Sequence, residues 1–470
     1  MKTKKIFLIK TLGCKVNQYE SEAIRESFCS RGLNEAQEEE KADIYIINTC
    51  TVTFRSDRKS RQLIARCARA NPNALIVVTG CYAELKQAEL LSLPGVGLVV
   101  GNEGKDRIAD FVLEGKTGCL GVEAADTFSP LKIKNFSAHS RAFVKVQDGC
   151  DNFCAYCIIP YMRGRPRSRP RPDCLAEIER LIHGDRPSSS FKGKGLLNRG
   201  FQEIVLTGIN LAKYGVERNK PEELNVLLEE IERMEGSFRV RLSSIEPMHI
   251  TSRLIETIVS AKKICPHLHI PLQSGDDRVL KRMKRGYTSR GYLVLIKKLR
   301  KKIPHIAITT DVIVGFPGED EKAFSNTLRT ISAVRPSRMH IFSYSKRPGT
   351  LAASYPDKVD SRAVKDRYNR LSILERELRF QYHNTFLNKE VEVLIETRVP
   401  MKNSGARSQG DFLAGYTDTY IKCHIKPAPK INPAPQTDGR ALNKRLVKVR
   451  IDAADYDFIS GIMVGGFIPG

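Results

Sequence analysis

The sequence contains no uninterrupted run of 18 apolar residues, so no membrane-spanning helix is expected. Its first apolar run extends only from Ile6 to Ile9 before Lys10 interrupts it. That run is too short for the core of a secretory signal and has the length of a β-strand. These absences predict a cytoplasmic protein without a membrane partner.

Acidic residues are in the minority, since 53 Asp and Glu stand against 77 Lys and Arg, and the formal net charge is +24. A field of this sign attracts phosphate polymers such as nucleic acids. A merely basic, soluble surface has the same charge balance, so charge alone does not choose between the two. In a reducing cytosol, the twelve cysteines are expected to be ligands, nucleophiles or core residues rather than disulfides.

The chain divides into regions by its pattern of strands and helices. Residues 1–115 alternate apolar segments of strand length, at 6–12, 43–48 and 74–80, with stretches of helical spacing. This βαβ pattern predicts an α/β domain with a parallel sheet covered by helices. Residues 116–135 have mixed polarity and no clear period, which indicates a linker.

Residues 136–375 carry a second alternating series. Its six strand-like segments are 142–147, 203–208, 239–244, 267–272, 307–315 and 339–345. Six βα units predict a partial (β/α)6 barrel rather than a closed eight-stranded one. Residues 376–470 hold strands without helices between them, which predicts a small all-β barrel of a kind often used on nucleic acids. Two polar segments, 183–200 and 426–436, are expected to be loops.

Three cysteines lie close together in QDGCDNFCAYC, at Cys150, Cys154 and Cys157. They follow the first strand of the barrel series, and functional groups of such barrels lie at the carboxyl ends of strands. Three thiolates suit a four-iron four-sulfur cluster whose fourth iron is left for another ligand. A zinc site is the alternative, but structural zinc needs four ligands and the next cysteine is only at Cys174.

A second set of cysteines, Cys14, Cys50 and Cys81, follows the three N-terminal strands. The carboxyl ends of parallel strands meet at one edge of a sheet, where ligands bind, so these thiols are expected to converge and hold a second cluster. Three unrelated core cysteines are the alternative. Core positions are also the interpretation of the other cysteines outside the central loop: Cys29, Cys67, Cys119, Cys174, Cys265 and Cys423.

The Cys-x3-Cys-x2-Cys motif, with Tyr156 before its last cysteine, resembles the radical S-adenosylmethionine (SAM) superfamily. Together with TLGCKVNQYES, NTCTVT, TGCYAE and DVIVGFPGE, it resembles the methylthiotransferase family over nearly the whole chain and in the same order. The resemblance implies an N-terminal cluster domain, a radical SAM core and a C-terminal RNA-binding TRAM barrel. It also implies a transferase with two four-iron four-sulfur clusters, in which one SAM methylates sulfur and a second supplies a 5′-deoxyadenosyl radical.

The same resemblance implies a SAM site at the ends of successive barrel strands. Its expected residues are Tyr156, Gly208, Asn210, Glu246, Gln273, Val314 and Gly315. A strand-end glycine alone is more often a simple turn. The recurrence of such residues after successive strands is what indicates a binding site.

Arginine occupies every second position of MRGRPRSRPRP, at Arg163, Arg165, Arg167, Arg169 and Arg171. An extended chain, which the prolines of this segment favour, puts these side chains on one side. Guanidinium groups suit phosphates and stack on bases, so Arg163, Arg165, Arg167 and Arg169 are predicted to bind RNA. A solvated charged strand is the alternative.

TLGCKVNQ and NFCAYCIIPYMRGR most closely resemble the family branch that acts on threonylcarbamoyladenosine beside the tRNA anticodon. The implied reaction inserts a methylthio group at carbon 2 of that adenine. The implied partners are the tRNA anticodon loop, a sulfur source and an electron donor of the flavodoxin or ferredoxin type. Branches acting on isopentenyladenosine in tRNA or on a ribosomal protein are alternatives, and a nonenzymatic metal-binding RNA-binding module is a hypothesis from another class.

Overall fold

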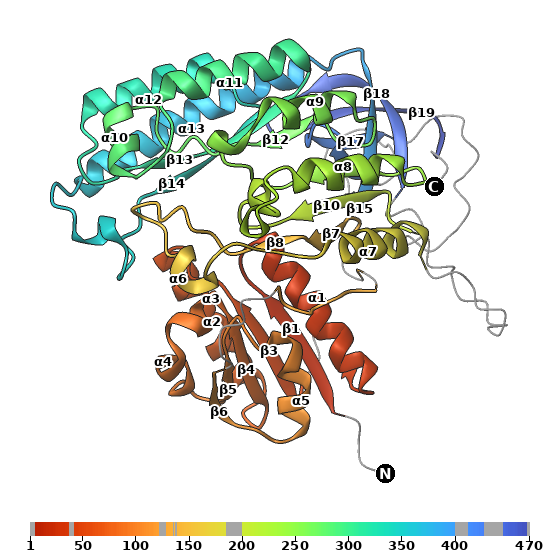
Figure 1. Ribbon diagram of the computed structural model, residues 1–470, viewed down its shortest axis with the longest axis vertical. Coiled ribbons are helices and arrows are strands. Elements are labelled where there is room, and N and C mark those ends of the chain that lie inside the picture. Colours follow the sequence, from red (N-terminus) through yellow and green to blue (C-terminus); the bar gives the residue numbers. More distant parts are fainter. Residues whose placement is uncertain are drawn as a thin grey trace, which may run out of the picture.

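The computed structural model describes residues 5–36, 42–121, 128–134, 136, 139–184, 200–399, 412–426 and 445–467. Among these residues, no helix is both long enough and apolar enough to cross a membrane. Figure 1 shows the N-terminal domain in red and orange below the central region, with the C-terminal strands in blue at the other end. The expected loops at 183–200 and 426–436 lie almost entirely outside the described residues.

A six-stranded parallel sheet forms the N-terminal domain, in the order β2-β1-β3-β4-β5-β6. Its strands are β1 (Ile6–Thr11), β2 (Asn34–Glu35), β3 (Ile44–Thr49), β4 (Leu75–Gly80), β5 (Val96–Val100) and β6 (Gly118–Leu120). The predicted parallel sheet and its three predicted strands are confirmed. The edge strand β6 lies inside the predicted linker, because three residues are too few to show a period in the sequence.

Helices cover both faces of this sheet because its strands are apolar on both sides. On one face, α1 (Lys15–Ser30) and α5 (Ile108–Leu113) share a hydrophobic cluster with the strands. On the other face lie α2 (Phe54–Ala70), α3 (Cys81–Leu85) and α4 (Gln87–Leu91). This arrangement leaves the carboxyl ends of the strands open at one edge.

Six parallel strands form the central region in the order of the sequence. They are β7 (Ala142–Lys145), β10 (Glu203–Thr207), β11 (Arg239–Leu242), β12 (His267–His269), β13 (Ala307–Val314) and β14 (Arg338–Ser343). Isolated bridges, Val240 to Ile264 and Ser244 to His269, join the first three strands to the last three. This row, with β7 and β14 at its edges, is the predicted partial (β/α)6 barrel.

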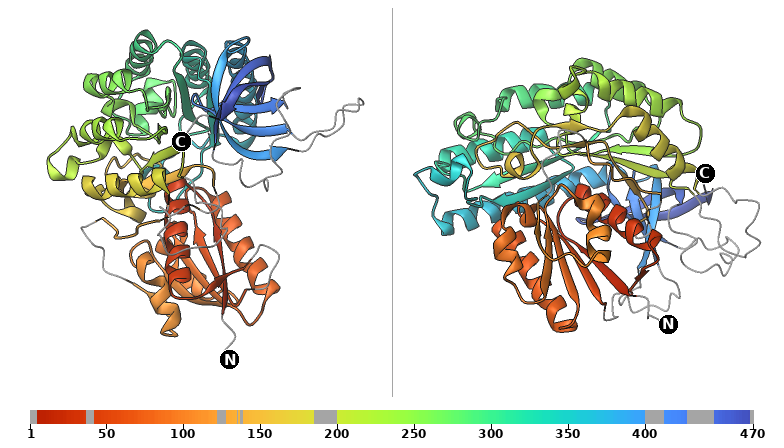
Figure 2. Two further views of the ribbon diagram at one scale, coloured as in Figure 1. Left: turned by 90° about the vertical axis from the view of Figure 1, so that its right-hand side faces the viewer. Right: turned by 60° about the horizontal axis from the view of Figure 1, so that its bottom comes forward.

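The longer helices of this region cover the outer face of the row (Figure 2). They are α7 (Arg171–His183), α8 (Glu223–Arg233), α9 (Ser252–Ser260), α10 (Asp277–Arg282), α11 (Ser289–Lys302), α12 (Glu321–Val334) and α13 (Ser361–Asn384). The cysteine loop adds the short elements β8 (Gln147–Asp148), α6 (Ile159–Arg163) and β9 (Arg167–Ser168). Short 3₁₀ helices lie at Lys105–Arg107, Leu211–Lys213, Val216–Arg218, Pro247–His249 and Leu351–Ser354.

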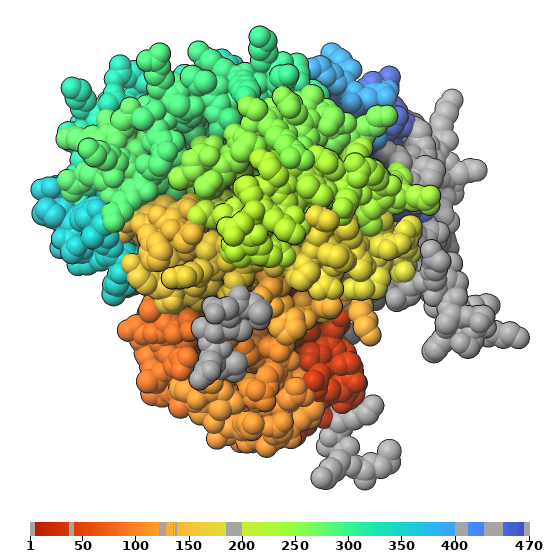
Figure 3. Space-filling view, in the orientation of Figure 1, coloured from red at the N-terminus to blue at the C-terminus, as the bar shows by residue number. Residues whose placement is uncertain are grey.

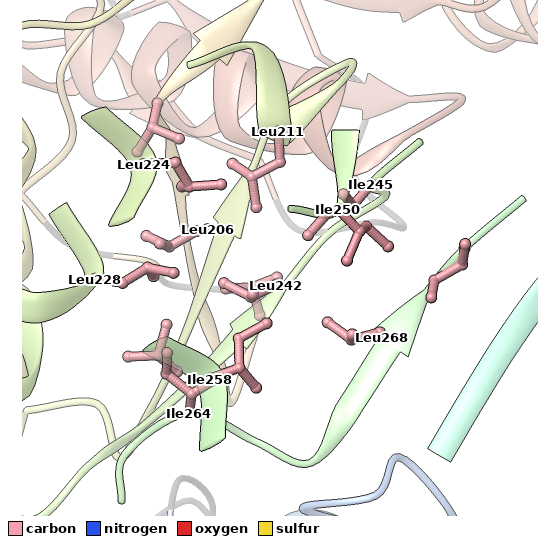
Figure 4. Packing of buried hydrophobic residues seen from close by; sticks show 14 of the residues in the cluster. Leu206, Leu211, Leu224, Leu228, Leu242, Ile245, Ile250, Ile258, Ile264 and Leu268 are labelled. Atoms are coloured by element: carbon pink, nitrogen blue, oxygen red, sulfur yellow. The ribbon is translucent and has the colours of Figure 1, made fainter. Parts of the chain in front are cut away.

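A hydrophobic cluster fills the space between these strands and helices. Leu206, Leu242 and Leu268 from neighbouring strands meet Leu228 of α8 and Ile258 of α9 (Figure 4). Complete burial of each such side chain contributes about 1.5–3 kcal/mol. Since side chains alternate along a strand, the residues that flank these leucines point to the inner face of the barrel.

The C-terminal strands form a closed five-stranded barrel, consistent with a TRAM barrel, in the order β15-β16-β17-β19-β18. They are β15 (Glu390–Val399), β16 (Phe412–Thr417), β17 (Lys422–Lys426), β18 (Leu446–Ala454) and β19 (Ile459–Phe467). Arg241 of β11 holds this barrel against the central region by donating to the carbonyl oxygens of Thr417 and Asp418, over 3.0 and 2.7 Å. The helix α13 leads into the barrel and runs through the expected domain boundary between residues 375 and 376.

Candidate functional site: two cysteine sites across a domain interface

The three N-terminal cysteines meet at the carboxyl edge of the sheet. Cys14 precedes α1, Cys50 follows β3 and Cys81 begins α3, and the strands before them are adjacent in the sheet. A side chain at Gly13 would lie only 3.2 Å from the Sγ atom of Cys50. Burial raises the pKa of Cys50 to about 11, and the neighbouring Cys81 and Cys14 also raise it. The structure places the three cysteines together at this edge of the sheet, as the sequence predicts. Their role as ligands of a second cluster stays a prediction.

The central cysteines occupy a tight loop after β8. Gly149 has a φ of +74°, and a side chain there would lie 2.0 Å from the carbonyl oxygen of Arg165, so only glycine fits. The amide of Cys157 donates to the carbonyl of Cys154 over 2.9 Å. Burial, with added repulsion from Cys154 and Cys150, raises the pKa of Cys157 to about 12. The Cys157 thiol therefore requires a positive partner to become a thiolate.

Arg285 lies against this loop although it is 131 residues from Cys154 in the sequence. Its Nη1 atom donates to the Sγ atom of Cys154 over 3.2 Å, and its Nη2 atom pairs with Glu246. Only 1% of the Arg285 side chain is exposed. A buried cation beside the thiols offsets part of the negative charge that an iron–sulfur cluster with three thiolates brings.

A buried group of polar and charged residues joins the two cysteine sites, and we term it the interdomain network: Asn17, Glu20, Lys105, Lys145, Asp148 and Arg163. Arg163 lies 3.0 Å from oxygens of both Glu20 and Asp148. Lys145 lies 2.7 Å from Glu20 and 2.6 Å from Asp148. Figure 3 shows the two domains pressed together along a broad seam.

The interdomain network borders both cysteine loops, and the Cys14 thiol donates to Asn17 Oδ1 over 3.8 Å. Asn17 stands three residues after Cys14, and Asp148 stands two residues before Cys150. Burial alone would raise the pKa of Glu20, but the surrounding cations Arg163, Lys105 and Lys145 outweigh it and hold that pKa well below its ordinary value. Glu20 is therefore an anion, and the network sets the position of one cysteine site relative to the other.

Six of the seven predicted SAM residues lie at or just after the carboxyl ends of β10 to β13, while Tyr156 lies in the cysteine loop. Contacts link several of the six to that loop. A side chain at Gly208 would lie 2.9 Å from Gln147, just before the loop. Glu246 reaches Cys154 through Arg285. The ring of Tyr156 packs edge-on against Phe316, next to Val314 and Gly315, with centroids 6.4 Å apart.

Two of these residues have features typical of a ligand site. Asn210 is 1% exposed, and neither atom of its side-chain amide has a hydrogen-bond partner among the described residues. Buried amides are normally hydrogen-bonded, so this one fits the amino and carboxylate groups of a bound SAM. Gln273 has a φ of +66°, which is uncommon for a residue other than glycine and is found at functional sites.

Comparison with known proteins decides the family. Residues 6–101 match the Uncharacterized protein family UPF0004, and residues 144–331 match the Radical SAM superfamily. The threonylcarbamoyladenosine tRNA methylthiotransferase MtaB of Bacillus subtilis (strain 168) is 38% identical over 461 residues, which cover 97% of this chain and 95% of that protein. This chain belongs to the tRNA methylthiotransferase family of radical SAM enzymes. Membership implies a transferase that uses SAM and a four-iron four-sulfur cluster.

Other relatives of this methylthiotransferase have a different substrate in their names. The tRNA-2-methylthio-N(6)-dimethylallyladenosine synthase of Moorella thermoacetica (strain ATCC 39073 / JCM 9320) is 32% identical and covers 99% of this chain and 100% of that protein. The radical SAM methyltransferase TsrM from Kitasatospora setae, solved with cobalamin and a [4Fe-4S] cluster, matches with a TM-score of 0.52 at 13% identity, covering 74% of this chain and 77% of that one. The structural match supports the fold alone.

The arginine run of this methylthiotransferase does not form an extended strip on one side. Arg163 ends α6 and is 3% exposed within the interdomain network. Arg169 is 2% exposed and donates to Glu177 over 2.8 Å. The prediction that these two arginines contact RNA is therefore wrong. Buried cations need anionic partners, and both arginines pair with carboxylates inside the protein.

The other arginines of the run lie nearer the surface. Arg167 and Arg171 form ion pairs, with Glu103 over 2.6 Å and with Glu223 over 3.0 Å. Arg165 is exposed, on the turn after α6. RNA binding by Arg165 and Arg167 stays a prediction.

Sequence reasoning missed several residues of the methylthiotransferase site. Glu20 and Arg163 are 143 residues apart, so no local spacing relates them. Arg285 is similarly remote from Cys154, and only the fold brings the pair together. Two of the cysteines interpreted as core residues, Cys29 and Cys119, are exposed, because one lies on the outer side of α1 and the other on the edge strand β6.

Proposed function

We propose that this chain inserts a methylthio group at carbon 2 of N6-threonylcarbamoyladenosine 37, beside the anticodon of tRNA. The observation that carries this proposal is the presence of two three-cysteine sites in adjacent domains, joined by the interdomain network. Insertion of a methylthio group needs one site that handles sulfur and another that activates a carbon–hydrogen bond. Relatives named for threonylcarbamoyladenosine are 37–38% identical to this chain, against 32–34% for those named for dimethylallyladenosine.

The two cysteine sites have separate roles in this proposal. Cys150, Cys154 and Cys157 hold the cluster that, when loaded with SAM, supplies the 5′-deoxyadenosyl radical. Arg285 balances charge at that site, while Asn210, Glu246 and Gln273 bind the SAM and Tyr156 packs on its adenine. Cys14, Cys50 and Cys81 hold a second four-iron four-sulfur cluster, where sulfur is methylated and delivered. A sulfur source and an electron donor of the flavodoxin or ferredoxin type complete the reaction.

Exposed aromatic rings around the cysteine loops support an RNA substrate. Phe153 and Tyr161 are 50% and 53% exposed and pack edge to face with centroids 5.8 Å apart. Phe54, close after Cys50, is 54% exposed. Aromatic rings stack on unpaired bases, and a target base must leave its stack before its carbon 2 is reachable. The net charge of +24 and the C-terminal barrel favour the same partner.

The test is mass spectrometry of tRNA nucleosides from a strain that lacks this gene. We expect loss of the methylthio form of threonylcarbamoyladenosine and accumulation of the unmethylthiolated form. Complementation with the wild-type gene restores the product, whereas the Cys154→Ala gene, as a matched control, does not.

The alternatives give different outcomes in the same strain. Loss of the methylthio form of isopentenyladenosine instead would assign the substrate of the related branch. Unchanged tRNA nucleosides together with an unmethylthiolated ribosomal protein would assign the protein-modifying branch. Zinc in the purified protein, without iron, would support a nonenzymatic metal-binding module and reject the enzymatic proposal.

A further inference from the structure

The inner face of the barrel carries a continuous chain of polar side chains, which lies away from the cysteine loops. His267 Nε2 lies 3.1 Å from Thr309 Oγ1, and His269 Nδ1 lies 2.9 Å from the same oxygen. His269 Nε2 lies 3.2 Å from Asp311 Oδ2, and His340 Nδ1 lies 3.1 Å from Asp311 Oδ1. Three adjacent strands, β12, β13 and β14, supply these residues.

The hydrogen bonds along this chain have one direction. The Nδ1 atom of His267 is buried without a partner among the described residues. An orphaned donor is rarer than an orphaned acceptor, so the proton of His267 lies on Nε2 and is donated to Thr309. The Thr309 hydroxyl then donates to His269 Nδ1, and His269 donates from Nε2 to Asp311. Asp311 also accepts from His340, so both of its oxygens are occupied.

This direction disfavours a metal ion at the same place. His269, Asp311 and His340 lie close enough to hold a divalent cation. To do so, His269 would give up the Nε2 proton that the rest of the chain places there, and Asp311 would lose both hydrogen bonds. Burial would raise the pKa of Asp311, but the hydrogen bonds from His269 and His340 outweigh it and lower that pKa. The Asp311 carboxylate therefore already has its hydrogen-bond partners, as an anion between two imidazoles.

The edge strand β14 extends this polar surface toward the cysteine sites. Its alternate residues Met339 and Ile341 pack on the hydrophobic cluster under the helices, so Arg338, His340 and Phe342 face the barrel interior. Arg338 is exposed, and 49% of the His340 side chain and 43% of Phe342 are exposed. From the amino to the carboxyl end of the strand, this face presents a cation, an imidazole and an aromatic ring, spaced about 7 Å apart.

We propose that Arg338, His340 and Phe342 form the subsite for the target nucleoside and select its threonylcarbamoyl group, a proposal that rests on the function proposed above. Phe342 lies toward the carboxyl ends of the strands, where the cysteine loops gather, and stacks on the adenine. His340, held by Asp311, hydrogen-bonds to the ureido group on N6. Arg338, farthest from the cysteine loops, pairs with the threonyl carboxylate. An isopentenyl group has no atom for either polar contact.

The test uses fluorescently labelled anticodon stem-loop RNAs and the anaerobically reconstituted protein with SAM. The RNAs carry threonylcarbamoyladenosine, its carboxylate methyl ester, or unmodified adenosine. We expect Arg338→Gln to weaken binding of the threonylcarbamoyl RNA about tenfold and to leave the unmodified RNA unchanged. The ester removes the charge from the RNA side, so wild type should bind it as weakly as Arg338→Gln binds the acid. Phe342→Ala should weaken all three RNAs equally.

Arg290→Gln, on the outer helix α11, is the matched control because it removes the same charge from an exposed position. If Arg338→Gln and Arg290→Gln weaken the binding of all RNAs equally, Arg338 contributes only non-specific electrostatic attraction to RNA. That result would overturn the proposal. Binding of one zinc ion per chain that His340→Ala abolishes would also overturn it in favour of a metal site. If wild type methylthiolates the threonylcarbamoyl RNA while Arg338→Gln keeps full discrimination, the β14 subsite alone is rejected. If wild type methylthiolates none of the RNAs, the proposed function itself fails.

Discussion

Arg285 donates a hydrogen bond from Nη1 to the Sγ atom of Cys154 over 3.2 Å, and its Nη2 atom pairs with the partly buried carboxylate of Glu246. Hydrogen bonds and positive charge near the sulfur atoms of a cluster favour its reduced, more negative state. Arg285→Ala should therefore shift the reduction potential of the central cluster to a more negative value, and Arg285→Lys, which keeps the charge, should shift it less. Redox titration followed by electron paramagnetic resonance measures both.

Arg278 offers the control for that titration, because it belongs to the adjacent helix α10 and forms an exposed pair with Asp320. Arg278→Ala should leave the potential unchanged. Identical potentials for wild type and Arg285→Ala would refute the role of Arg285.

The interdomain network should dominate the stability of the domain interface. Arg163→Met leaves Glu20 and Asp148 buried with one cation fewer, and breaking such a buried pair costs about 3–5 kcal/mol. Urea denaturation of the reconstituted protein measures the loss. Lys132→Met, which removes an exposed ion pair with Asp173, should cost less than about 1 kcal/mol. Similar losses in the free energy of unfolding for the two variants would contradict the dominant role of the interdomain network.

The same network predicts how stability depends on pH. Nearby cations outweigh burial and hold the pKa of Glu20 well below 4.5 and that of Asp148 below 3.8. A carboxyl group whose folded pKa is depressed contributes stability that is present above its ordinary pKa and is lost as the pH falls toward the folded value. Wild type should therefore lose stability steeply below about pH 4.5, the ordinary pKa of Glu20. Glu20→Gln should show a shallower acid dependence in urea titrations, and parallel pH profiles would argue against this linkage.

The two cysteine sites should fail differently when mutated. Cys154→Ala should abolish formation of 5′-deoxyadenosine. Cys50→Ala should retain SAM cleavage yet lose methylthio insertion, and its iron content should fall from about eight to about four atoms per chain. Chromatography of the reaction products and iron analysis separate these outcomes. Equal loss of both activities in both variants would count against divided roles.

Asn210 should contribute directly to SAM affinity. Its buried amide has no partner among the described residues, so Asn210→Ala removes a donor and an acceptor that the proposed SAM site leaves for the ligand. Calorimetric titration should show SAM binding weakened by about tenfold or more. Asn73→Ala, in the exposed turn before β4, should bind SAM as wild type does. Unchanged affinity in Asn210→Ala would place SAM elsewhere.

Features encoded by short segments were predictable from the sequence. The strands that precede Cys14, Cys50 and Cys81 are recognisable as apolar runs, and parallel strands bring their carboxyl ends to one edge. The spacing of Cys150, Cys154 and Cys157 lies within eight residues and by itself predicts an iron–sulfur cluster. The resemblance to methylthiotransferases drew on the same segments, which is why the family agrees with the known relatives and the fold class agrees with the structure.

Features that depend on partners far along the chain were not predictable. The alternation of arginines indicated an exposed strip, but Arg163 is buried against Glu20, which is 143 residues away. Arg169 pairs with Glu177 of α7, which is only eight residues away, yet the sequence does not show that this pair is buried. Likewise His269, Asp311 and His340 lie on three separate strands, and only strand pairing makes them neighbours. The sequence by itself determined the two sets of three cysteines, the alternation of strands and helices and the family, because local residue types and periods encode them. Tertiary structure alone decided which charges are buried as ion pairs and which side chains face the barrel interior, because that depends on how separate strands and helices pack against one another.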